Sequence, residues 1–134
     1  LGDFDATSTT IALAPGGETH LELAPGLPSR CRLRRGDKVG GYRPSVDVLF
    51  RSAEPVAERT VAVLLTGMGR DGAAGMLALR QGGARCLAQD EDSSVVFGMP
   101  RAALEIGAAE RAVALSEMSA AILDLCRAPD RRPA

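Results

Sequence analysis

The chain has 134 residues, of which 46% are hydrophobic and 25% charged, and its formal net charge is −1. These values are typical of one globular domain and exclude a disordered chain, while the dispersed basic residues argue against a nucleic-acid partner. No apolar run approaches the ~20 residues of a membrane span and no signal-like segment opens the chain, so we expect a soluble, cytoplasmic protein that is not membrane-inserted.

The first part of the chain predicts an antiparallel hairpin. Residues 9–13 form a β-like run, residues 15–17 have turn chemistry, and residues 20–23 alternate apolar and polar side chains. Residues 31–34 alternate again and extend the hairpin as a third short strand. His20 lies in this hairpin, and we expect a structural or supporting role for it, because one histidine alone cannot form a catalytic triad.

A glycine-rich loop and a helix follow. Residues 36–43 are glycine-rich and polar, and this loop is expected to border the active site. After Pro44, Ser45 can cap a helix that carries apolar residues on one face, namely Val46, Leu49, Phe50 and Ala53. Ser45 also has a nucleophile's hydroxyl, but no glycines surround it and no base is near in sequence. Helix capping is therefore the preferred interpretation of Ser45.

The stretch from residue 61 to residue 75 organises the chain. Residues 61–65 are an apolar run without polar alternation, which is typical of a strand buried on both faces. A glycine turn leads into a predicted helix over residues 73–81, which stops at two glycines. Residues 84–88 predict the next strand, which a right-handed crossover makes parallel to the first.

Asp71 is the only acidic residue in this turn and is the main functional candidate. In an open parallel sheet, ligands and catalytic groups collect at the carboxyl ends of the strands, where the turn should lie. A carboxylate placed there can orient a histidine, as the third member of a Ser-His-Asp system does. Neighbouring backbone N–H groups can then face a developing oxyanion.

The same turn contains a nucleotide-binding pattern. Gly67, Gly69 and Gly72 spell G-x-G-x-x-G between a strand and a helix, and Asp90 follows near the end of the next strand. Against this interpretation, the carboxylate of Asp71 would repel a pyrophosphate at the amides that should receive it. A nucleotide-binding half-domain therefore stands as the weaker alternative.

The remaining segments alternate between polar loops and short elements. Residues 90–92 predict a solvated acidic loop that lacks the spacing of a calcium site, with Ser93 or Ser94 capping a helix. Further predictions are a helix over residues 101–106 that starts at Pro100, a strand over 112–115, a final helix capped by Ser116, and a frayed tail over 128–134.

The three cysteines indicate neither disulfides nor a metal site. Cys31, Cys86 and Cys126 are odd in number, far apart and without C-x-x-C spacing, which is typical of buried free thiols in a cytosolic protein. A structural zinc site would need four Cys or His ligands in recognisable pairs, and the chain has one histidine. No metal is predicted.

Several motifs together resemble one known family. Residues 66–73 (TGMGRDGA), 43–50 (RPSVDVLF), 89–91 (QDE) and 95–101 (VVFGMPR) are similar to the catalytic domain of the CheB family of bacterial chemotaxis methylesterases. Ala14-Pro15-Gly16 with His20-Leu21 fits the family's early hairpin, and the matches run in the family's order from about residue 14 to residue 115. A smaller departure is Tyr42, where the family pattern usually has a histidine.

The resemblance implies a serine hydrolase of chemotaxis signal transduction. Such an enzyme removes methyl groups from glutamate methyl esters on the cytoplasmic domains of chemoreceptors and deamidates certain receptor glutamines, without a cofactor. Asp71 would be the triad aspartate, and Met68 would supply a backbone amide to the oxyanion. A response-regulator receiver domain controls the full-length proteins through a phosphorelay.

The family's nucleophilic serine and triad histidine belong to segments upstream of the hairpin, and neither segment is in this chain. We therefore expect residues 1–127 to be the C-terminal portion of a methylesterase catalytic domain that is inactive alone. The expected fold is three-layer α/β, with a Rossmann-like parallel sheet and an N-terminal antiparallel hairpin. A non-catalytic signalling or partner module is the other alternative.

Overall fold

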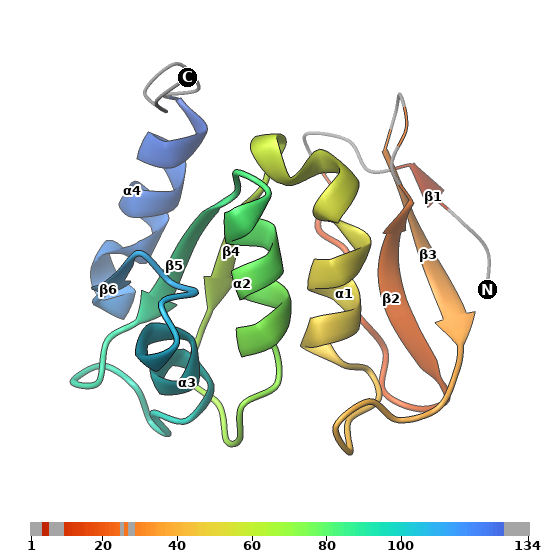
Figure 1. Cartoon of the computed structure of the whole chain (residues 1–134), viewed down its shortest axis with the longest axis horizontal. Helices are drawn as coiled ribbons and strands as arrows, with labels where there is room; N and C mark the ends of the chain where they lie inside the picture. Colours follow the sequence, from red (N-terminus) through yellow and green to blue (C-terminus); the bar gives the residue numbers. More distant parts are fainter. Residues whose placement is uncertain (1–3, 6–9, 25, 27–28, 128–134) are drawn as a thin grey trace.

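The computed structural model describes residues 4–5, 10–24, 26 and 29–127, which form two small sheets with helices beside them (Figure 1). One sheet is antiparallel with strand order β1-β3-β2, and the other is parallel with order β4-β5-β6. The α/β class, the parallel sheet and an antiparallel hairpin are thus confirmed. The frayed tail predicted for residues 128–134 lies outside the described residues.

The elements have the following bounds in chain order: β1 Phe4–Asp5, β2 Thr19–Ala24, β3 Arg30–Arg35, α1 Val46–Ser52, the 3-10 helix η1 Glu54–Arg59, β4 Val61–Leu64, α2 Ala73–Gln81, β5 Arg85–Gln89, α3 Met99–Glu105, β6 Arg111–Val113 and α4 Leu115–Cys126.

Helices cover both faces of the parallel sheet. Successive side chains of a strand point to opposite faces. Cys86 and Ala88 of β5 accordingly pack with Met76 and Leu79 of α2 in the main core. Leu87, between them in sequence, faces the other way and packs with residues of α4 in a second, smaller cluster. This confirms the three-layer arrangement and places the carboxyl ends of β4, β5 and β6 at one edge.

The hairpin forms between different strands from those predicted. Residues 10–13 carry no strand, Ile11 and Leu13 are 95% and 91% exposed, and Thr9 lies outside the described residues. The hairpin consists instead of β2 and β3. A β-like run needs a partner strand, and residues 11–13 pair with none of the described strands. β2 is instead paired with β3 on one edge, and on the other Ser52 of α1 accepts the backbone N–H of Leu23 at 2.8 Å.

Helix α1 joins the hairpin to the parallel sheet, and Figure 1 shows it between β2 and α2. On the side of α2, a Cβ at Gly75 would lie 3.0 Å from Asp47 Oδ1 and from Phe50 Cβ, so a larger residue would crowd this contact and glycine favours the close approach. The backbone N–H of Gly75 donates to Asp47 Oδ1 at 2.7 Å. Because α1 is anchored on both sides, it transmits the position of the hairpin to the sheet.

The start of α4 corrects a predicted cap. Ser116 is exposed, and the N-cap residue is Ala114, whose side chain makes no capping bond. Ser93 Oγ accepts the backbone N–H of Leu115 at 3.0 Å instead, so the acidic loop supplies the cap from a distance. The predicted capping role of Ser93 is confirmed, and the one predicted for Ser116 is wrong, because a tertiary contact replaced the local one.

The cysteines differ in environment, and the prediction of buried thiols holds fully only for Cys86. Cys86 is completely buried, Cys31 is half-buried and Cys126 is exposed. Burial raises the pKa of the Cys86 thiol to about 11, because the thiolate would lose its hydration. The thiolate is the reactive species, so two features protect Cys86 from thiol reagents. Burial keeps the reagent away, and the raised pKa keeps the thiol protonated.

We therefore predict selective alkylation. At about pH 8, a thiol reagent should modify Cys126 readily and leave Cys86 unmodified until the chain unfolds, because Cys86 is both inaccessible and protonated. Mass spectrometry of proteolytic fragments, with and without denaturant, measures this directly. Equal labelling of Cys86 and Cys126 under native conditions would contradict the packing of β5 against α2.

Candidate active site

The turn after β4, the start of α1 and the loop over residues 36–43 meet at the carboxyl edge of the parallel sheet, at the lower side of Figure 1. Asp71 belongs to this turn and is only 7% exposed. Sequence reasoning predicted both the turn and its place at the sheet edge.

The carboxylate of Asp71 is bound to the first turn of α1. Its Oδ1 accepts the hydroxyl of Ser45 at 2.8 Å and the backbone N–H of Asp47 at 3.1 Å. Its Oδ2 accepts the backbone N–H of Val46 at 2.7 Å. A negative charge at a helix N-terminus is favoured by the unpaired N–H groups there. Asp71 is therefore held by three donors from a segment about 25 residues earlier in the chain.

One acceptor position of Asp71 is not used by these bonds. A carboxylate offers about four lone-pair sites, two on each oxygen. Ser45 and Asp47 use those of Oδ1, and Val46 uses one on Oδ2. The fixed carboxylate can thus accept one further N–H at Oδ2, which is what orientation of a histidine requires.

Ser45 and His20 support this arrangement. Ser45 is 2% exposed, and its hydroxyl also accepts the N–H of Val48 at 3.5 Å, which confirms the predicted helix cap. The backbone N–H of Ser45 donates to Nδ1 of His20 at 3.1 Å. Nε2 of His20 must then carry the proton, and it donates to the backbone oxygen of Asp37 at 2.7 Å. With both ring nitrogens bonded, His20 has the structural role that was predicted.

Packing explains the glycines of the turn. Gly69 and Gly72 have φ of 89° and 94°, in the left-handed region that favours glycine. A Cβ on Gly69 would overlap the hydroxyl of Tyr42, and one on Gly72 would lie 2.8 Å from Val46. A Cβ on Gly67 would lie 2.5 Å from the sulfur of Met99, and the N–H of Gly67 donates to the oxygen of Val96 at 3.0 Å. The G-x-G-x-x-G pattern therefore needs no nucleotide to account for it.

Met68 lies at the tip of the turn and is 76% exposed. Within the part of the chain that the structure describes, its backbone N–H has no hydrogen-bond partner. A backbone amide without a partner can donate to an anionic oxygen, and this one is three residues before Asp71 in sequence.

A cavity of about 220 Å³ opens onto Asp71. This cavity lies between the glycine-rich loop, α1 and the start of α2. The loop thus borders the cavity at Asp71, in agreement with its predicted position beside the site. Its lining consists of Gly40, Tyr42, Asp47, Arg70, Asp71, Ala73, Ala74 and Ile106.

Gln89 is a site residue that sequence reasoning did not single out. It is 1% exposed at the end of β5, where its Oε1 accepts the N–H of Thr66 at 2.8 Å and its Nε2 donates to the oxygen of Ser93 at 2.8 Å. It therefore ties the glycine turn to the acidic loop. The sequence did contain a signal for this role, because Gln89 is a polar residue at the end of an apolar strand, and a buried polar side chain needs hydrogen-bond partners.

The acidic loop itself has local hydrogen bonds. Asp90 Oδ1 accepts the N–H and the hydroxyl of Ser93, at 3.0 and 2.5 Å. Among the described residues, no group of three or more His, Cys, Asp or Glu side chains is arranged to hold a metal ion.

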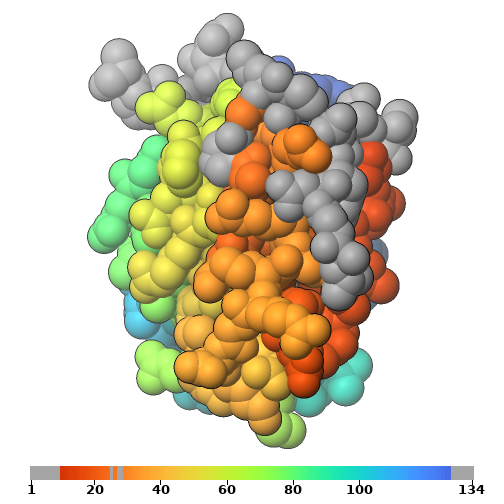
Figure 2. Space-filling model, turned by 90° about the vertical axis from the view of Figure 1, so that its right-hand side faces the viewer, coloured from red at the N-terminus to blue at the C-terminus, as the bar shows by residue number. Residues whose placement is uncertain are grey.

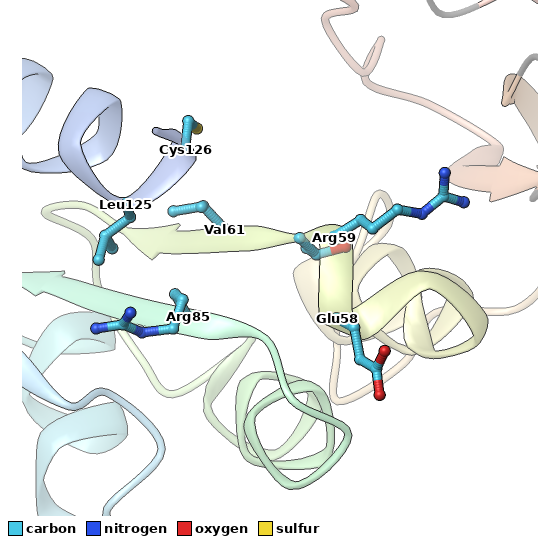
Figure 3. A pocket seen from close by; sticks show the side chains of 7 residues that line it. Glu58, Arg59, Val61, Arg85, Leu125 and Cys126 are labelled. Carbon is cyan, nitrogen blue, oxygen red and sulfur yellow. The ribbon is translucent and has the colours of Figure 1, made fainter. Parts of the chain in front are cut away.

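Another cavity, of about 270 Å³, lies at the opposite end of the sheet. Figure 3 shows Val61 and Arg85 at the amino ends of β4 and β5, with Leu125 and Cys126 of α4 above them. Arg85 is bound to Glu110 at 2.6 Å, and this bond lowers the pKa of the Glu110 carboxyl. None of the predicted site residues lines this second cavity.

Comparisons with known proteins agree on one family. The family model described as CheB methylesterase matches residues 5–122. A "Protein-glutamate methylesterase/protein-glutamine glutaminase 1" of Caulobacter vibrioides is 59% identical over 119 residues, and its counterpart in Agrobacterium fabrum is 53% identical over 119 residues. The crystal structure of the Thermotoga maritima CheB methylesterase catalytic domain is similar with a TM-score of 0.76 and 33% sequence identity.

The matched region is a part of each relative. It covers 88% of this chain but only 35% and 34% of the Caulobacter and Agrobacterium proteins, so the chain spans about a third of their length. The structural match covers 81% of this chain and 59% of the Thermotoga domain.

No helix among the described residues is long and apolar enough to cross a membrane.

The network around Asp71 predicts the effect of Ser45→Ala. This change removes both a hydrogen bond to a buried carboxylate and a helix cap, so the free energy of unfolding should fall by about 2 kcal/mol. Urea unfolding measures it. Ser45→Thr keeps the hydroxyl and should retain much of the stability that Ser45→Ala loses. Ser116→Ala at an exposed site should change stability by less than about 0.5 kcal/mol. Equal effects of Ser45→Ala and Ser116→Ala would contradict the network.

Proposed function

The chain belongs to the CheB methylesterase family, and we propose that its residues 1–127 form the C-terminal portion of a methylesterase catalytic domain. The family match over residues 5–122 and the partial coverage of the Thermotoga domain support this assignment. The complete enzyme would hydrolyse glutamate methyl esters on proteins and convert protein glutamines to glutamates, as the names of the relatives state for them.

In the proposed reaction, this chain supplies the aspartate. A serine from the upstream portion attacks the ester carbonyl, and a histidine from that portion takes the serine proton and passes it to the departing methanol. Water then hydrolyses the acyl-enzyme and leaves a glutamate carboxylate. Asp71 holds the histidine in the correct tautomer and stabilises its imidazolium form. No cofactor or metal takes part.

The observation that carries this proposal is the state of the Asp71 carboxylate. It is buried, held by three donors, and left with one acceptor position. A catalytic group fixed in this way needs no rearrangement when the reaction proceeds. The backbone amide of Met68, which has no hydrogen-bond partner among the described residues, would donate to the oxyanion of the tetrahedral intermediate.

The parallel sheet suggests where the upstream portion joins. β4 pairs only with β5 among the described strands, so its other edge is open for a further strand. Val61 and Val63 of β4 are only half-buried, and Leu65 is 44% exposed. A strand added in parallel to β4 would end at the same edge as Asp71, where the serine and histidine are needed.

The proposed partners follow from this activity. The substrates would be methylated cytoplasmic domains of chemoreceptors, which places the enzyme in the cytoplasm, and a response-regulator receiver domain would control it in the full-length protein. A nucleic-acid partner forms no part of the proposal. A non-catalytic partner module is the competing function, and the experiments below separate the two.

In the complete enzyme, we expect Asp71→Asn to lower turnover by up to ~10⁴-fold, the scale that the trypsin precedent gives for loss of the correct histidine tautomer. Methanol release from methylated receptor measures it, after circular dichroism has shown that the variant is folded, because the Asn amide also meets donors of α1. Asp92→Asn, an exposed carboxylate in the acidic loop, should leave turnover unchanged. A loss below about tenfold in folded Asp71→Asn would reject the assigned role.

We also expect no methanol release from this chain alone, and release once the upstream portion with its serine and histidine is present. Activity of the isolated chain that disappears in Asp71→Asn would make a serine of this chain the nucleophile, in contradiction to the proposal. Absence of turnover even in the complete protein would instead favour a partner module.

A further inference from the structure

A groove with three arginines runs between the hairpin and α1, outside the candidate site. Its volume is about 490 Å³. Figure 2 shows the face of the molecule on which the hairpin, in orange, lies beside α1, in yellow. The groove is lined by Glu22, Leu23, Arg32, Arg34, Val48, Arg51, Ser52 and Pro55.

Two of these arginines are held in place by a buried carboxylate. Glu22 lies opposite Arg32 in the register of β2 and β3, and its side chain is 8% exposed. Oε1 of Glu22 accepts Nε of Arg32 at 3.0 Å, and Oε2 accepts Nε and Nη2 of Arg34 at 2.8 and 2.7 Å. The bond to Arg34 is the main reason why the pKa of the Glu22 carboxyl is lowered, so Glu22 stays charged.

The guanidinium groups nevertheless reach the surface. The side chains of Arg32 and Arg34 are 47% and 54% exposed, and Arg32 bonds Glu22 through Nε, which leaves its terminal amino groups for another acceptor. The side chain of Arg51 in α1 is 55% exposed. Its ion pair with Glu54 is long, at 3.8 Å, and lies on the surface, so it is weak. Among its lining residues, the groove therefore contains three cations and one carboxylate.

We propose that this groove binds an acidic segment of the protein substrate. The inference rests on the proposed function, because each ester that the enzyme hydrolyses leaves a glutamate carboxylate on that substrate. Arginine binds carboxylates through paired N–H donors. Since Glu22 already fixes two of the guanidinium groups, less side-chain entropy is lost when an acidic segment binds.

The position of the groove fits a substrate that reaches Asp71. Asp71 holds the first turn of α1, and the groove follows the same helix from Val48 to Ser52. At 1.5 Å per residue, α1 is about 10 Å long. One protein segment can therefore contact the arginines while another of its residues lies at the carboxyl edge of the sheet. Arg32 and Arg34 lie on β3 and Arg51 lies on α1, so the arginines come from two elements, a spread that suits several carboxylates of one segment.

The test compares two substrates of the full-length enzyme: a methylated receptor fragment and a short uncharged peptide with one glutamate methyl ester. Arg51→Glu, which leaves the Glu22 pairs intact, should raise KM for the receptor fragment about tenfold, weaken its dependence on salt and leave kcat unchanged. KM for the short peptide should not change. Arg111→Glu, an exposed arginine on β6, is the matched control and should affect neither substrate.

A second variant removes the two arginines of β3 together with Glu22, so that no buried charge is left without a partner. The triple change Glu22→Gln, Arg32→Gln and Arg34→Gln should also raise KM for the receptor fragment alone. Unchanged KM and salt dependence in both variants, while the wild type hydrolyses the receptor fragment, would overturn the inference. An equal rise of KM for both substrates would also overturn it, because the groove would then support the domain and not the substrate. No hydrolysis by the wild type would instead reject the proposed function.

Discussion

The contact between the Asp71 carboxylate and the first turn of α1 is the interaction on which the arrangement of this structure depends. It joins the turn after β4 to a helix that comes earlier in the chain. That helix in turn bonds the hairpin through Ser45 and His20 and through Ser52 and Leu23. Without an acceptor at this point, the half-buried backbone N–H groups of Val46 and Asp47 that begin α1 would lose their partner.

This dependence gives Asp71 a structural function beside the catalytic one that we propose for it. A buried carboxylate costs free energy unless hydrogen bonds replace its lost hydration, and the donors of α1 provide them. The same bonds hold the carboxylate in one orientation, which a triad aspartate needs. Under the proposed function, stability and catalysis would therefore be coupled at Asp71, and activity measurements on its variants must be read together with measurements of folding.

Sequence reasoning found the parts of this site that are local in the chain. The apolar strand, the glycine turn, the position of Asp71 and the cap at Ser45 follow from patterns within a few residues. The bond between Ser45 and Asp71 and the tie from Gln89 to Thr66 join residues more than 20 positions apart, and no local pattern predicts them. The strand predicted over residues 9–13 failed for a related reason, because strand formation depends on a partner edge and not on propensity alone.

The helix α1 connects the two surfaces that matter for the proposed enzyme. Its first turn fixes Asp71 at the sheet edge, and its later residues form one wall of the arginine groove. A displacement of α1 would thus move Asp71 and the proposed substrate contacts together. Because Gly75 allows α2 to approach α1 so closely, the helix is held against the rigid sheet and not carried by a loop. Under the proposal, the position of a bound protein segment relative to Asp71 would therefore be set by the packing of two helices, which is more precise than contacts made through loops.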